Sequence, residues 1–232
     1  MGNWDSFISK FQQCFLDDNR FLYLLTGLKT TLLITLFAVL LGVVLGFLVA
    51  IIRSTYDKTG KLKLLNLICN IYLTVIRGTP VMVQLLIMYY VIFATTSMDK
   101  VVVAILSFGI NSGAYVAEIV RSGIMSIDQG QFEAGRSLGF SYPLTMVYII
   151  MPQAFKNVLP ALANEFIVLL KETSICGYIG LMDLTRGGDI IRSVTYEAFL
   201  PLIAVAAIYL CMVMILTALV KKLERRLRNS ER

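Results

Sequence analysis

Long apolar runs recur along this chain and constrain its fold more than any other feature. Each run approaches the roughly 20 residues that an α-helix needs to span the hydrocarbon core of a bilayer. Hydrophobic residues make up 57% of the chain, and its mean hydropathy of +0.76 is high for a soluble protein of this size. The runs do not alternate polar and apolar residues as barrel strands do. Because a helix satisfies its own backbone hydrogen bonds in lipid, the sequence predicts an all-α integral membrane protein.

Five transmembrane helices are predicted from these runs. They lie at 21–52, 62–96, 100–124, 154–174 and 198–221. The second run is longer than a straight crossing requires. We therefore expect it to be tilted, or broken at Gly78 and Pro80, where a proline removes a helical hydrogen bond.

The segment 1–20 precedes the first span and is predicted to be an amphipathic helix lying in the membrane interface. Its apolar residues recur at helical spacing beside charged and polar ones. These residues are Trp4, Phe7, Ile8, Phe11 and Phe15. The segment does not follow the basic, apolar and small-residue order of a cleaved signal peptide, so we interpret it as mature sequence that anchors or orients the first span.

Charges in the loops predict the orientation in the membrane. Basic residues flank the first connection near Arg53 and Lys63 and fill the tail at 223–232, whereas Asp17 and Asp18 precede the first span. Because cytoplasmic loops carry the excess of lysine and arginine, we expect the N-terminus outside and the C-terminus in the cytoplasm. The formal net charge of +6 reflects this pattern, so no nucleic-acid partner is expected.

Two further features limit the possible functions. The chain contains no histidine, which excludes histidine-ligated metal sites, serine triads and imidazole proton relays. We therefore expect neither a metal site nor a set of catalytic residues. No phosphate-binding GxxxxGK[ST] motif occurs either, so ATP and magnesium, if used, belong to another chain.

Small residues recur every fourth position in two of the predicted spans, which is typical of helices that pack closely in a membrane. They are Gly42, Gly46 and Ala50 in the first span, and Gly109, Gly113 and Ala117 in the third.

The loop 126–152 has helix signals at both ends. Asp128 followed by Gln131 resembles a capping box, and Gly139 suits a left-handed position after a helix. A second helix is predicted from Ser141 to near Pro152, which makes a two-helix elbow on the cytoplasmic face. Local physics alone leaves a plain connecting loop as the alternative to a partner-binding elbow.

The same loop resembles the EAA loop of bacterial ABC importer permeases. The matching residues are Glu133-Ala134-Gly135, Gly139, Ile149 and Met151-Pro152, with Gly135 in place of the second alanine and Met151 in place of leucine. Elsewhere, Arg77-Gly78-Thr79-Pro80 and the run from Ala114 to Arg121 look like the polar amino acid branch of that family. The resemblance covers nearly the whole chain from about residue 20.

This resemblance implies a type I, MetI-like transmembrane domain at 21–222 in a bacterial inner membrane. It implies partners as well: two copies of an ATPase subunit, an extracytoplasmic solute-binding protein, and a second permease chain, either identical, forming a homodimer, or related. The elbow would seat in a groove of the ATPase and couple its movement to the membrane helices. The coupling residues implied are Glu133, Ala134, Gly135, Arg136, Gly139 and Pro152.

Polar and charged residues inside the spans form the candidate cargo site, since a charge near the bilayer centre costs roughly 2.5–3.5 kcal/mol and needs a partner or a function. The candidate residues are Glu165, Arg77, Glu118, Asn111, Asn164 and Thr79. One interpretation is a structural ion pair of Arg77 with Glu118 or Glu165. The other is a pocket whose guanidinium and two carboxylates complement both ends of a free amino acid.

In the second interpretation, one carboxylate remains for a cationic side chain, so arginine, lysine or histidine is the favoured cargo and glutamine or glutamate the alternative. Glu165 is the residue expected to set selectivity. Arg121 lies near enough to the cytoplasm to extend its guanidinium to the surface. The competing function classes are an ion channel, which would need polar rings, and a membrane enzyme, which would need a catalytic cluster.

Overall fold

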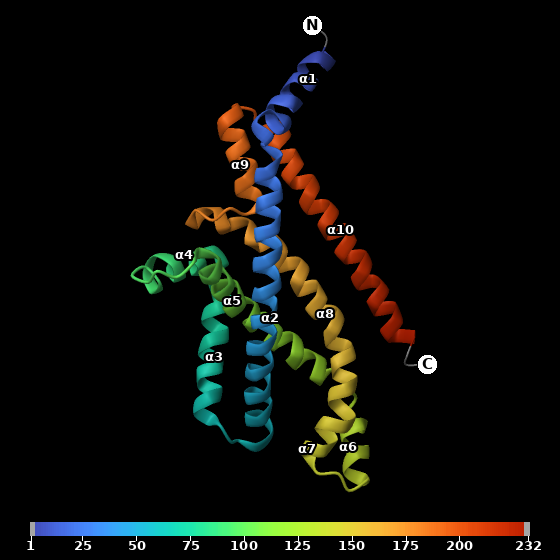
Figure 1. The fold of residues 1–232 in the computed structure, drawn as a ribbon. Helices are drawn as coiled ribbons and strands as arrows, with labels where there is room; N and C mark the ends of the chain where they lie inside the picture. The colour runs from blue at the N-terminus through green and yellow to red at the C-terminus, as the bar shows by residue number, and fades with distance from the viewer. Residues whose placement is uncertain (1–2, 230–232) are drawn as a thin grey trace. The chain divides into compact units, whose positions relative to one another are not determined.

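The structure is a computed structural model that describes residues 3–229, with the side chains of residues 4–57 and 60–227. The described chain is helical nearly throughout (Figure 1). The α-helices are α1 (Asn3–Phe11), α2 (Phe21–Thr59), α3 (Lys63–Gly78), α4 (Val81–Ile87), α5 (Lys100–Met125), α6 (Gln129–Ser137), α7 (Tyr142–Thr145), α8 (Met151–Glu172), α9 (Leu184–Thr195) and α10 (Phe199–Asn229). Short π- or 3₁₀-helical segments join some of them: η1 (Gln12–Leu16), η2 (Asp17–Asn19), η3 (Met88–Ile92), η4 (Met146–Ile150) and η5 (Thr173–Ile179).

The predicted spans agree with these helices. Among the described residues, four helices are long and apolar enough to cross a membrane, and the bent pair α3–α4 makes a fifth if it is taken as one span. The predicted break in the second span is confirmed, because α3 ends at Gly78 and the chain bends by 110° before α4. Thr79 is extended, at φ −124° and ψ 147°, as expected for the residue before a proline.

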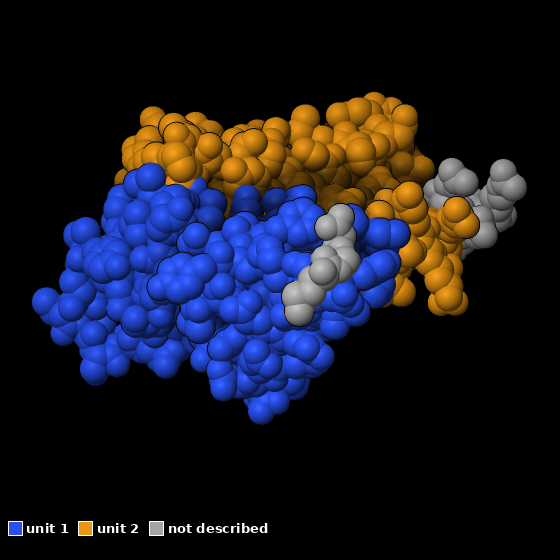
Figure 2. Space-filling view, turned by 90° about the horizontal axis from the view of Figure 1, so that it is seen from above, with its two compact units in different colours: residues 1–38, 81–108, 167–216 blue, residues 39–80, 109–166, 217–232 orange. Residues whose placement is uncertain are grey.

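The contacts divide the chain into two compact units, coloured separately in Figure 2. Unit 1 contains residues 1–38, 81–108 and 167–216, and unit 2 contains residues 39–80, 109–166 and 217–232. Each unit has its own buried apolar clusters, and we describe them in turn.

Unit 2 is built on the two small-residue stripes that the sequence predicts. A Cβ added to Gly42 would lie 2.8 Å from the side chain of Ser112, and one added to Gly46 would lie 2.8 Å from the backbone nitrogen of Ala117. Since real Cβ atoms do not approach so closely, only glycine permits this contact between α2 and α5. The Tyr72 hydroxyl then ties α3 to α5 by donating to the Ile110 carbonyl at 2.6 Å.

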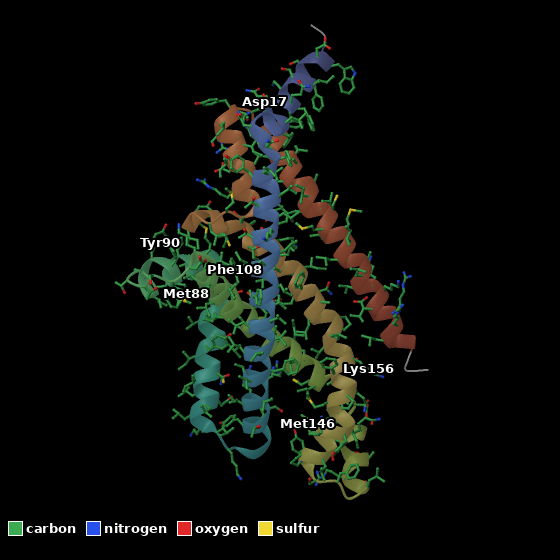
Figure 3. All side chains as sticks on the ribbon, in the orientation of Figure 1. Asp17, Met88, Tyr90, Phe108, Met146 and Lys156 are labelled. Atoms are coloured by element: carbon green, nitrogen blue, oxygen red, sulfur yellow. The ribbon has the colours of Figure 1, made fainter. Side chains whose placement is uncertain are left out.

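One prediction in this unit is wrong. The helix that begins at Tyr142 does not end near Pro152 but continues through η4 into α8, as an unbroken helix from Tyr142 to Ile179. The π-helical turn explains the difference: the amide of Met151 donates to the carbonyl of Met146, so the register shifts just before the proline, which lacks an N–H. Figure 3 labels Met146 at this turn.

Unit 1 is centred on an apolar cluster that joins the N-terminal segment to α2, α9 and α10. Its buried members are Cys14, Phe15, Leu24, Leu184, Ile191 and Val205. The predicted N-terminal helix exists as α1, and Trp4, Phe7, Ile8 and Phe11 on it are exposed. Its interfacial role, like the division at residues 20 and 222, stays a prediction.

Asp183 is a fully buried carboxylate in this unit. Its Oδ1 caps α9 by accepting from the backbone N–H of Arg186 at 3.1 Å, while Oδ2 has no hydrogen-bond partner within the described part of the chain. Burial raises the pKa of Asp183 to about 6, against the lowering effect of backbone N–H groups. At neutral pH the folded state therefore carries a buried negative charge on Asp183, and burial favours the neutral acid over this charged form.

Replacement of Asp183 by asparagine should stabilise the protein more at pH 7 than at pH 4.5. The pKa of Asp183 in the folded state lies above the ordinary value of 3.8 for this side chain, so the folded state binds more protons than the unfolded state between about pH 4 and 6. Wild-type stability therefore falls as pH rises through that window. Asparagine keeps the cap but carries no charge. The melting temperature of D183N minus that of wild type, both measured in detergent, should be about 2–4 °C higher at pH 7 than at pH 4.5.

The matched control is Asp189→Asn on the same helix. Arg192 and Arg186 hold the pKa of Asp189 below its usual value, so D189N should lose stability relative to wild type as pH rises. A gain for D183N that is equal at both pH values would contradict the assignment of a buried ionised carboxylate.

Candidate functional site

An open cavity of about 610 Å³ lies in unit 2, between α3, α5 and α8. Three of its lining residues carry charge, namely Arg77, Glu118 and Glu165. These are three of the six predicted cargo residues, and the helices bring them together from positions far apart in the sequence. The remaining wall is formed by Tyr115, Ile119, Ser122, Gly123, Ser126, Asn157 and Ala161.

Glu118 is surrounded by three guanidinium groups. Arg121, one turn further along α5, donates from Nε at 3.1 Å and from Nη2 at 2.5 Å to Glu118 Oε1. Arg77 of α3 and Arg53 of α2 approach the other oxygen, Oε2, at 3.6 Å and 3.7 Å. The predicted ion pair of Arg77 with Glu118 is therefore present as one part of a larger cluster.

Glu165 has a different environment. Its Oε1 accepts a hydrogen bond from the hydroxyl of Ser112 at 2.8 Å, and Ser112 is fully buried. Within the described part of the chain, no lysine or arginine lies in ion-pair distance of this carboxylate. Of the two carboxylates that line the cavity, Glu165 is thus the one that a guanidinium does not neutralise.

Arg77 sits at the break between α3 and α4. Its side chain is 44% exposed, and its guanidinium lies over the ring of Tyr115, 5.8 Å from the centroid. A guanidinium has five N–H donors in a planar fork that matches a carboxylate. With Arg77 and Glu165 in its wall, the cavity can pair a carboxylate and an ammonium of one small molecule.

The other three predicted cargo residues do not line this cavity. Asn111 is buried within α5. Asn164 and Thr79 are exposed, and the Thr79 hydroxyl donates to the Val75 carbonyl at 2.8 Å.

Sequence analysis missed two features of the site. Arg53 was counted as a loop charge because the first span was predicted to end at residue 52, whereas α2 continues to Thr59. Arg121 was expected to extend towards the cytoplasm, but it binds Glu118. Residues three positions apart lie next to each other on a helix, so the spacing of Glu118 and Arg121 in the sequence is enough to predict this second contact.

A second candidate site is the elbow formed by α6 and α7. The N-cap at Asp128 is confirmed, with its Oδ1 accepting from the Gly130 amide at 2.7 Å. The predicted reciprocal bond from Gln131 is replaced, because the Gln131 side chain accepts from Gln153 at 3.3 Å instead. Gly139 has φ +83°, the left-handed conformation predicted for it.

The elbow has a tightly packed inner face and an apolar outer face. Gly135 is buried against α7, where a Cβ would lie 2.5 Å from Thr145 Cγ2. On the outer face Leu138 is 73% exposed and Tyr148 is 69% exposed. Of the predicted coupling residues, Glu133, Ala134, Arg136, Gly139 and Pro152 are exposed and only Gly135 is buried. Exposed apolar side chains beside charged ones are typical of a protein-binding surface.

Substitution of Gly135 by leucine should open the elbow, because the new side chain has no space between α6 and Thr145. The expected result is faster proteolytic cleavage within residues 126–150, by about tenfold or more if the packing is lost. The matched control is Ala134→Leu, which places the same side chain at an exposed neighbouring position. Equal cleavage of the two variants would contradict the packing described here.

Comparison with known proteins identifies chains of similar sequence and fold. Residues 42–229 match the family described as "Binding-protein-dependent transport system inner membrane component". The putative glutamine transport system permease protein GlnP of Rickettsia typhi is 40% identical over 172 residues, which cover 73% of this chain and 79% of that protein. The arginine transport system permease protein ArtQ of Bacillus subtilis is 41% identical over 166 residues, covering 71% of this chain and 76% of that protein.

Two solved structures share the fold. The crystal structure of an amino acid ABC transporter with histidines aligns with a TM-score of 0.84 and 44% identity, covering 91% of this chain and 98% of that one. An inward-facing MetNI methionine ABC transporter aligns with a TM-score of 0.75 at 20% identity, which shows a common fold.

Proposed function

This chain belongs to the family of binding-protein-dependent transport system inner membrane components, and we propose that it is the permease subunit of an ATP-driven importer of polar amino acids. It is a multi-pass membrane protein and a transport component. The amino acid permeases and the amino acid transporter among its relatives support this cargo class. ATP hydrolysis is assigned to a separate ATPase subunit, because this chain lacks a phosphate-binding loop.

The observation that carries the cargo class is the cavity with Arg77 and Glu165 in its wall. A free amino acid has a carboxylate that suits the guanidinium of Arg77 and an ammonium that suits the carboxylate of Glu165. An ion channel would be expected to conduct when the purified chain is reconstituted alone. An importer is expected to move cargo only with its ATPase partner and ATP.

Within this class, the cargo is a basic amino acid such as arginine, lysine or histidine, with glutamine or glutamate as the alternative. Relatives named for glutamine and for arginine are both similar to this chain, so their names agree with either cargo. The property that separates them is the charge of Glu165, since a cationic side chain gains an ion pair that a neutral one does not.

Replacement of Glu165 by glutamine therefore tests the basic cargo. The preference for arginine over glutamine, measured as competition for binding to the reconstituted transporter, should fall by about tenfold for the loss of one partly buried ion pair. Ser112→Ala is the matched control, because it removes the hydrogen bond to Glu165 but keeps the charge. An unchanged preference in E165Q would exclude Glu165 as the source of selectivity.

We assign the elbow to the ATPase. Its exposed residues Glu133 and Arg136 stand beside the exposed Leu138, and the EAA-like spacing of this loop supports a coupling role. Two ATPase subunits closing on ATP would move the elbows of two permease chains as rigid bodies and open the pathway to alternate sides. The second permease chain is either an identical copy or a related chain.

Glu133→Ala should separate transport from cargo binding. We expect cargo uptake and cargo-stimulated ATP hydrolysis to fall at least about tenfold, because a charged contact at the subunit interface is removed. Cargo binding to the detergent-solubilised chain should stay within about twofold of wild type. Glu224→Ala, an exposed position on α10, is the control. Normal ATP-driven uptake in E133A would argue against coupling through this residue.

The orientation follows from the loop charges. We place the N-terminus outside and the C-terminus in the cytoplasm of a bacterial cell, which puts the elbow on the side of ATP. Cargo would reach the opposite face from an extracytoplasmic solute-binding protein, and the external segment around Asp189 is a candidate contact for it.

A further inference from the structure

We infer that Glu118 is a positioning residue that holds the arginine cluster, Arg77 included, and is not a ligand for the cargo. The inference rests on the proposed function, since it assigns a role within the same cavity. It narrows the sequence-based interpretation, in which one guanidinium and two carboxylates, Glu118 and Glu165, complement the cargo and Glu165 sets its selectivity.

Both carboxylate oxygens of Glu118 already face positive charge. Oε1 accepts two bonds from Arg121, at 3.1 Å and 2.5 Å, and Oε2 faces the guanidinium groups of Arg77 and Arg53. A cargo ammonium that approached this carboxylate would have to displace a guanidinium and would meet the repulsion of the remaining two. Glu118 is therefore poorly suited to bind an ammonium group.

The three arginines differ in their contacts to Glu118 and in their exposure, and this difference identifies the one that can bind the cargo. Arg121 is bound by two short contacts from the same helix, and Arg53 has a side-chain exposure of only 24%. Arg77 and Arg53 approach Glu118 at similar distances, 3.6 Å and 3.7 Å, but Arg77 is 44% exposed and is the one that lines the cavity. Its guanidinium is held in place by electrostatic attraction to Glu118 and by a cation–π contact with the ring of Tyr115.

Charge balance explains why the cluster needs its carboxylate. Three guanidinium groups come together from α2, α3 and α5 around one Glu118, inside spans where an unpaired charge is costly. Without the carboxylate, the arginines repel one another, and Arg77, the most exposed of the three, moves away. The cavity then loses the guanidinium that faces the cargo carboxylate.

This assignment has a consequence for Glu165. If Glu118 is committed to arginines, Glu165 is the lining carboxylate left to meet positive charge on the cargo. A basic amino acid brings two cationic groups towards this one carboxylate, whereas glutamine brings one, so the charge of Glu165 still favours the basic cargo.

The test is a double-mutant cycle of E118Q, R121Q and E118Q/R121Q. Each variant is assembled with its ATPase partner in nanodiscs, and equilibrium binding of radiolabelled arginine and glutamine is measured without the solute-binding protein. E118Q should weaken binding by about tenfold or more, as expected for a lost charge-assisted contact, and R121Q should weaken it less. The double variant lacks one of the three mutually repelling guanidinium groups and has the wild-type net charge at the cluster, so binding should recover part of the loss seen in E118Q, to within about threefold to fivefold of wild type.

A second readout separates positioning from a general structural defect. The wild type should bind arginine more tightly than its methyl ester, because the ester cannot pair with Arg77. In E118Q this ratio should fall towards one, and in the double variant it should return.

Two results would overturn the inference. One is equal loss of binding in E118Q and in the double variant, which would mark Glu118 as a cargo ligand. The other is an unchanged ester ratio in E118Q. A wild-type complex that binds neither amino acid would instead overturn the proposed function itself.

Discussion

The absence of water in the bilayer core is the constraint on which the rest of this structure depends. Every backbone N–H and C=O within a span needs a partner in the chain, which favours long continuous helices. The same solvent offers no hydrophobic drive for helix association, so close packing at Gly42 and Gly46 takes its place. Proline disrupts the regular helical hydrogen bonding at two places, with different results: the chain bends by 110° before α4, and it forms a π-helical turn before Pro152.

Charge is subject to the same constraint. Arginines and carboxylates inside the spans are stable only when they meet, and the two carboxylates of the cavity meet different partners. Glu118 gathers three guanidinium groups, whereas Glu165 receives a hydroxyl from Ser112. One carboxylate is thereby committed to architecture, and the other is left facing the cavity. This asymmetry, more than the presence of two acids, is the feature on which the proposed recognition of an amino acid depends.

The elbow is the part of unit 2 that we propose contacts the ATPase. It is folded by local signals, namely the cap at Asp128 and the left-handed Gly139, and packed through the buried Gly135. Because η4 joins it to α8 without a break, a displacement of the elbow is carried along the helix that also bears Glu165.

The sequence by itself determined the helical membrane class, the positions of the spans, the break at Gly78 and Pro80, and both ends of α6, because these depend on hydropathy and on local backbone chemistry. Only the tertiary structure decided which charges are neighbours. Arg53 and Arg77 are far from Glu118 in sequence, and the registers of α2 and α3 against α5 bring them together. Asn164 and Thr79 carry suitable groups but lie outside the cavity, because the rotation of α8 turns Asn164 away from it and Thr79 lies in the extended break after α3.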